Sequence, residues 1–132
     1  MNKRTSGEDR QMLLLAHASR YHWGLVGTAR NHVVGDWQLS RIYAALGQPA
    51  LALSFAKAAL SICQENGLSD ITPSAHEGVA RAYAAAKETP KAEENLAKAR
   101  RLLDKLDLGD EDRKIYLDQF EDTQRLIDGS AV

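Results

Sequence analysis

The sequence predicts an all-α fold of about six helices, arranged as antiparallel helical hairpins that stack on one another. Two observations carry this prediction. A set of small residues and one tyrosine repeats after forty positions, and glycine or proline stands wherever one helix would end and the next begin. Between these signals, apolar residues recur at helical spacing. No segment shows a convincing strand pattern.

The first two helices precede the first clear turn. The first is expected from Glu8 to Val26, with Ser6 as its N-cap, because an acidic first turn suits the positive end of the helix dipole. Gly27-Thr28 should break the chain. The second helix is expected from Ala29 to Leu46, and Gly47 should end it as a left-handed residue.

The third and fourth helices both begin with proline, which costs nothing at a first helical position because the missing N–H would be unpaired there. The third is expected from Pro49 to Asn66, and its wide apolar stripe indicates a helix covered on two sides. Gly67 should end it. Thr72-Pro73, an N-cap followed by proline, should start the fourth helix, which is expected to reach Lys87.

The last two helices follow the same rules. Thr89-Pro90 should start the fifth, which runs to Leu106 before Gly109. Asp110 should cap the sixth, and Gly129 should end it. The sixth helix has one core-facing stripe and an acidic outer face, as a terminal helix facing water requires; the stripe consists of Tyr116, Phe120, Thr123 and Ile127.

Composition limits the classes of function. A chain of 132 residues with 44% apolar content can bury a stable core without disulfide bonds or a structural metal ion. The net charge of −1 argues against nucleic-acid binding, although residues 1–66 carry an excess of positive charge and residues 67–132 an excess of negative charge. The single cysteine, Cys63, fits a reducing compartment. We find no signal peptide and no membrane-spanning run, so we expect a cytoplasmic protein without membrane contact.

The repeat consists of two copies of one pattern. The first copy has Ser40, Tyr43, Gly47, Ala52 and Ala59, and these are answered forty residues later by Ala80, Tyr83, Lys87, Ala92 and Ala99. Alanine where helices cross lets the backbones approach, and the tyrosine fills the groove beside the crossing. The pattern resembles the tetratricopeptide repeat, although its period is longer than that family's and Lys87 replaces the turn glycine.

The resemblance implies a right-handed superhelix and a module that binds a protein or peptide in its concave groove. We divide the single domain, 1–132, into four parts: an N-terminal helix (8–32), repeat 1 (33–67), repeat 2 (72–106) and a capping helix (110–128). No cofactor is implied.

The groove of such a module is built mainly by the first helix of each hairpin. On that basis the candidate partner-binding residues are Trp37, Arg41, Glu77 and Arg81. Tryptophan beside two arginines suits a peptide carboxylate or an acidic side chain. An alternative stays open, in which Glu77 and Arg81 form an ordinary i,i+4 ion pair and Trp37 is a packing residue.

A second cluster surrounds the Gly27-Thr28 break and could line a small pocket; it consists of Tyr21, His22, Trp23, Asn31 and His32. Histidine titrates near neutrality and can serve as a ligand or a base. Packing is the simpler interpretation, because no acid or nucleophile stands at a telling spacing.

Metal and catalytic motifs are incomplete. His76-Glu77 begins like a zinc-protease helix, but Ala80 occupies the place of the second histidine. His32 and Asp36 alone would make a weak metal site. We therefore expect no metal, no cofactor and no enzymatic activity. The favoured hypothesis is an adaptor for a protein or an acidic peptide. The alternatives are a small-molecule-sensing or enzymatic domain using His22, Trp23 and His32, and a structural homodimer.

Overall fold

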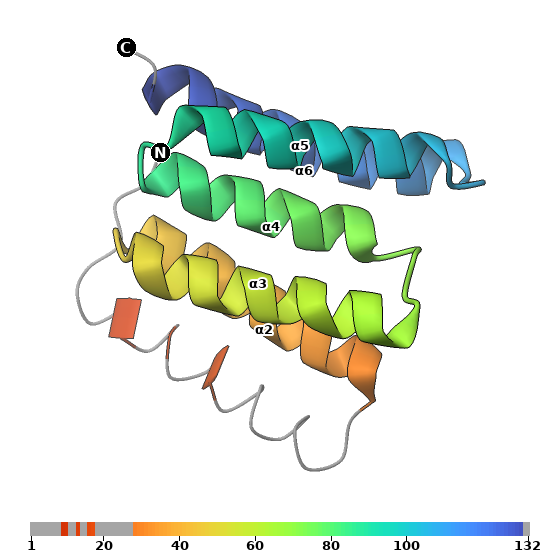
Figure 1. Cartoon of the computed structure of the whole chain (residues 1–132), viewed down its shortest axis with the longest axis horizontal. Coiled ribbons are helices and arrows are strands. Elements are labelled where there is room, and N and C mark those ends of the chain that lie inside the picture. The colour runs from red at the N-terminus through yellow and green to blue at the C-terminus, as the bar shows by residue number, and fades with distance from the viewer. Residues whose placement is uncertain (1–8, 11–12, 14–15, 18–27, 131–132) are drawn as a thin grey trace.

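Five helices make up the main body of this computed structural model, which describes residues 9–10, 13, 16–17 and 28–130 (Figure 1). They are α2 (Ala29–Ala45), α3 (Pro49–Asn66), α4 (Thr72–Ala85), α5 (Thr89–Asp104) and α6 (Asp110–Ser130). The described residues contain no strand. The all-α prediction is confirmed. Most of the expected first helix lies outside the described residues, although residues 9–10, 13 and 16–17 are helical.

Helix α4 is the centre of the arrangement. It contacts each of the other four helices, whereas α2 and α6 have no Cα atoms within 8 Å of each other. In Figure 1, α3 lies in front of α2 and α5 lies in front of α6, with α4 between the two pairs. Helices α2, α4 and α6 therefore form one layer, in which α4 separates the other two.

The repeated small residues lie at the helix crossings, as the pattern predicts. Ser40 and Ala80 are buried in the first helices of the two hairpins, and the repeated alanines of α3 and α5 are fully buried; they are Ala52, Ala59, Ala92 and Ala99. The ring of Tyr43 stacks on Phe55 at 5.6 Å between centroids. Alanine at these positions allows close approach because its side chain is a single methyl group.

A large apolar cluster joins α6 to the second hairpin. Phe120 and Ile127 of α6 pack in one cluster with Leu96 and Leu103 of α5 and with two alanines of α4, Ala80 and Ala84. Phe120 is fully buried. Burial of a side chain of this size contributes roughly 1.5–3 kcal/mol. Helix α6 is thus held in place by the apolar core on one side.

The helix starts differ in detail from the sequence expectation. Thr72, Thr89 and Asp110 are the first helical residues and not N-caps. At α4 the N-cap is Ile71, and the Thr72 hydroxyl donates to the carbonyl of Leu68 at 2.7 Å. The physical reason is that residues 68–71 already form a turn, in which Ile71 N–H donates to the same carbonyl. Pro73 and Pro90 therefore fall at the second helical position, whereas Pro49 is the first residue of α3.

The two hairpin turns have the same geometry despite different residues. Gly47 and Lys87 both have a left-handed backbone, with φ of 72° and 61°. In each turn the following residue donates its N–H to the carbonyl of the repeat tyrosine, Tyr43 or Tyr83, at 2.9 Å. A left-handed backbone costs a residue with a Cβ about 1 kcal/mol or more. Lys87 nevertheless adopts it, because the turn between the two helices of the repeat requires this conformation.

We predict that Lys87→Gly stabilises the protein by about 0.5–1 kcal/mol, since relief of the strain exceeds the flexibility gained by the unfolded chain. The matched substitution Gly47→Lys should destabilise by a similar amount. A Cβ at Gly47 would meet no atom within 4 Å, so any loss there reports backbone strain alone. Urea unfolding midpoints at unchanged m-value measure both effects; equal midpoints for wild type and Lys87→Gly would contradict the account.

Candidate functional site

Glu77 lies in the middle of α4 and is fully buried, with no exposed surface. This differs from a groove-facing residue in contact with solvent, which is how the sequence placed it. A buried carboxylate is costly unless charged partners and hydrogen bonds compensate for its lost hydration. Its surroundings therefore decide what the other candidate residues can do.

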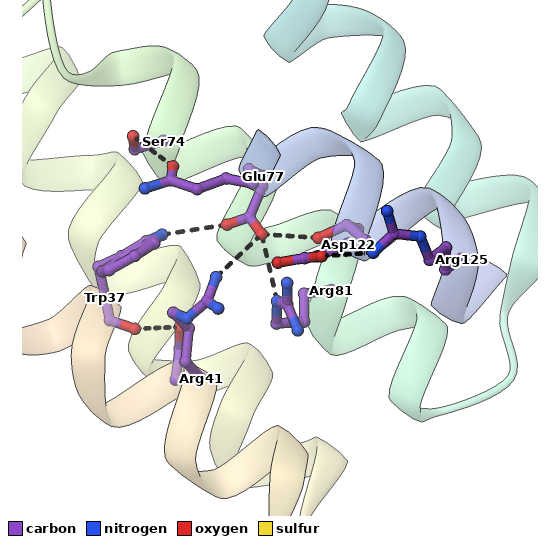
Figure 2. A network of polar contacts seen from close by, with 10 residues as sticks. Trp37, Arg41, Ser74, Glu77, Arg81, Asp122 and Arg125 are labelled. Atoms are coloured by element: carbon purple, nitrogen blue, oxygen red, sulfur yellow. Dashed lines mark hydrogen bonds and ion pairs between the residues drawn. The ribbon is translucent and has the colours of Figure 1, made fainter. Parts of the chain in front are cut away.

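Four donors reach the Glu77 carboxylate (Figure 2). Trp37 Nε1–H donates to Oε2 at 3.1 Å. Three donors share Oε1, namely Arg41 at 3.4 Å, Arg81 at 3.1 Å and the Thr123 hydroxyl at 2.6 Å. An ionised carboxylate has about four lone-pair sites. The donors are concentrated on Oε1, whereas Oε2 accepts one hydrogen bond, and they come from side chains of α2, α4 and α6.

Trp37 is a half-buried residue that joins α2 to α4. Its indole donates to Glu77, and the Arg41 guanidinium carbon lies 4.8 Å from the centre of its ring. Close approach depends on Gly78, because a Cβ there would lie 3.1 Å from Trp37 Cδ1 and 3.5 Å from Ser40 Oγ. Glycine inside α4 thus makes room for the tryptophan.

The two repeated arginines are not equivalent in the structure. Arg81 keeps only 13% of its side chain exposed, and its Nη2 atom is buried without a hydrogen-bond partner. Arg41 keeps 31% exposed. Burial, together with the charge of Arg81, lowers the pKa of Arg41 from its usual value. Of the two, only Arg41 keeps a substantial part of its side chain exposed, so the expectation that both arginines face outward fails for Arg81.

A half-open cavity of about 140 Å³ lies beside Trp37, between α2, α4 and α6. Its walls are mainly apolar, and its lining residues are Val33, Val34, Trp37, Ile71, Ser74 and Gln119. Two of the lining residues bond to each other, because the Ser74 hydroxyl donates to Gln119 Oε1 at 3.4 Å (Figure 2). Farther along α6, Asp122 accepts from Arg125 at 2.9 Å.

A second polar connection lies near the start of α2. Arg30 donates two hydrogen bonds to the Asp70 carboxylate, at 2.6 and 3.1 Å, and the Tyr116 hydroxyl of α6 donates to the Asp70 carbonyl at 2.6 Å. The Arg30 guanidinium lowers the pKa of Asp70. Both side chains of the ion pair are about half exposed, so this pair contributes little on its own.

The second predicted cluster is only partly within the described residues. Tyr21, His22 and Trp23 lie outside them. Asn31 and His32 stand in the first turn of α2, where Asn31 N–H donates to the Thr28 hydroxyl at 3.4 Å, as N-capping requires. A pocket formed by all five residues stays a prediction.

Residues 9–10, 13, 16–17 and 28–130 contain no group of three metal-ligating side chains. Burial raises the pKa of the Cys63 thiol and lowers that of His76. No helix in the same ranges is long and apolar enough to cross a membrane.

Sequence reasoning missed the contribution of α6 to this site. Thr123 completes the Glu77 network, and Gln119 lines the cavity. The one available signal was a threonine within the core-facing stripe of α6, since a buried hydroxyl needs an acceptor. Nothing in the local pattern identified Glu77, forty-six residues away, as that acceptor.

The helical pairs and the repeated alanines agree with the comparison against protein families. A family model for the tetratricopeptide repeat matches residues 33–105, more than half of the chain. The chain therefore belongs to the tetratricopeptide repeat family. It is a helical repeat module of a kind that typically mediates protein interactions. No curated protein and no solved structure shows a significant match.

We predict that Glu77→Gln lowers the free energy of unfolding by about 3–5 kcal/mol, because two buried or half-buried guanidinium groups lose their counter-charge. The control is Glu94→Gln, which removes the exposed Glu94–Lys98 pair at 3.4 Å and should cost less than about 0.5 kcal/mol. Urea unfolding followed by circular dichroism compares the two variants. Equal losses would show that the Glu77 network contributes no more than a surface pair.

Proposed function

We propose that this protein is an adaptor that docks a protein or peptide against the layer formed by α2, α4 and α6. The observation that carries the proposal is the arrangement of this layer: α2 and α6 flank α4 without contacting each other. Membership of a family that mediates protein interactions supports it. Of the four residues predicted from the sequence, Trp37 and Arg41 would contact the partner.

Glu77 and Arg81 would have a different role in this proposal. Both are too buried to meet a large partner. Glu77 holds Trp37 and Arg41 in place through hydrogen bonds, and Arg81 pairs with Glu77. They are positioning residues. A cytoplasmic location and a partner with acidic character complete the proposal.

Exposed apolar side chains on the same layer favour docking. Val34 of α2 is 44% exposed and lines the cavity. On α6, Ile115 and Leu126 are 58% and 44% exposed. Helical spacing places both on one stripe with Gln119 and Asp122, the side that approaches α4 through Gln119. Apolar surface with a polar rim is typical of interaction sites.

A random peptide library displayed on phage tests the proposal. Peptides enriched on the wild-type protein should bind Arg41→Gln at least about tenfold more weakly, because one charge-assisted contact is lost. Arg101→Gln, which removes the same charge from an exposed position on α5, should leave binding unchanged. Circular dichroism checks that both variants are folded.

Two results would contradict docking on this layer. One is a failure of the library to enrich any peptide on the folded protein. The other is a set of enriched peptides that bind wild type, Arg41→Gln and Arg101→Gln equally well, which would place the binding surface elsewhere.

A further inference from the structure

The cavity between α2, α4 and α6 is framed by a polar network at each end. At one end Arg30 of α2 bonds to the carboxylate of Asp70, just before α4, and Tyr116 of α6 donates to the Asp70 carbonyl. At the other end the Glu77 carboxylate of α4 accepts hydrogen bonds from side chains of α2 and α6. Both networks therefore join the same three helices.

The lining residues of the cavity stand between these two networks. Ser74 of α4 is one helical turn from Asp70 and one turn from Glu77, and it lines the cavity. On α6, the lining residue Gln119 is one turn beyond Tyr116. Because hydrogen bonds at both ends fix the spacing of the helices, the cavity is formed before anything enters it. A preformed site spares a ligand the cost of ordering the protein.

The size and the walls of the cavity suit one uncharged ring. An apolar cavity of about 150 Å³ in a protein core accommodates benzene, and this one measures about 140 Å³. Two of its walls, Val33 and Ile71, also pack in an apolar cluster of the core. Trp37 forms another wall, and aromatic rings pack favourably on one another. A charged group would lose its hydration at such walls.

The cavity offers a ligand one polar contact. The Ser74 hydroxyl donates to Gln119 Oε1 at 3.4 Å, and within the part of the chain that the structure describes this is the one hydrogen bond of the Gln119 side chain. The two N–H donors of its amide are thus available to a ligand. A hydroxyl or carbonyl oxygen on the ring would accept from them.

A peptide main chain matches this site less well than a small molecule does. Each peptide residue other than proline brings an N–H and a C=O that need partners. The polar lining side chains of the cavity are Ser74 and Gln119, already bonded to each other, and Trp37, whose N–H donates to Glu77. A free molecule with one ring and one oxygen leaves fewer groups without partners.

We propose that this cavity binds a free, uncharged aromatic molecule of one ring, with the ring against Trp37 and an oxygen substituent on the amide of Gln119. The ligand would contact α2 and α6 at once, two helices that do not pack against each other. This inference goes beyond the proposed docking function and does not depend on it.

Phenol is the probe, and nuclear magnetic resonance titration of the ¹⁵N-labelled full chain measures its binding. Signals of the cavity residues should shift and saturate in the millimolar range, as expected for so small a ligand; they include the indole N–H of Trp37 and the side-chain amide of Gln119. Benzoate should bind at least about tenfold more weakly, because its charge would lose hydration at the apolar walls.

Gln119→Met separates the polar contact from the contacts of the ring. Methionine keeps the length of the side chain and removes both N–H donors. Phenol should lose about two- to tenfold in affinity relative to toluene, which has nearly the same shape and no hydroxyl. Gln124→Met is the matched control, because Gln124 also lies on α6 but bonds to Asp128 and does not line the cavity. There the ratio of the two affinities should be unchanged.

Val34→Asp tests the location of the site. Val34 lines the cavity, so a charge there should weaken phenol binding by about tenfold or more. Leu51→Asp is its matched control: Leu51 on α3 is also 44% exposed but does not line the cavity, so binding should be unchanged. Circular dichroism checks that every variant is folded.

Three outcomes overturn this inference. The first is the absence of saturating shifts at the cavity residues of the folded wild-type protein. The second is equal behaviour of a variant and its matched control, which would place phenol elsewhere or remove the contact with Gln119. The third is tighter binding of a blocked glycine-tyrosine-glycine peptide than of phenol to the same residues, which would make the occupant a tyrosine side chain of a docked partner.

Discussion

The buried carboxylate of Glu77 is the constraint on which the rest of the layer depends. A carboxylate without exposed surface loses its hydration, and the protein must replace that hydration with donors. Here four donors do so, from three helices. Two of those helices, α2 and α6, do not pack against each other, so Glu77 is the point at which both are tied to α4. The apolar core holds α6 against α5, whereas the Glu77 carboxylate holds α2 and α6 in place beside α4.

Apart from Thr123, the residues of this network stand at corresponding positions of the two repeat copies. Positions 37 and 77 correspond in the two copies, as do 41 and 81. The first correspondence places an indole against a carboxylate, and the N–H of one repeat donates to the acid of the next. The second duplicates an arginine in two environments. Arg81 is enclosed between hairpins, while Arg41 stands at an end of the network and keeps its solvent-facing side.

Much of the fold follows from the sequence because its signals are local. Alanine spacing, the repeat tyrosine and the glycine turn each act within one hairpin. Lys87 is an exception, because the sequence placed it at the end of the fourth helix and the structure gives it a left-handed turn after α4. The site was less predictable. Glu77 and Arg81 are spaced as an exposed ion pair, and the pair does form, yet it is buried by contacts forty and forty-six residues distant. Such burial has no signature in a local pattern.

Hydrogen exchange of the Thr123→Val protein tests most directly whether Glu77 ties α6 to the layer. The substitution keeps the shape of the side chain and removes one hydrogen bond to a charged group, which is worth about 1.5–3 kcal/mol. Amides of α6 should lose protection by roughly tenfold or more, while those of α3 keep theirs. Unchanged protection in α6, or an equal loss in every helix, would contradict the account.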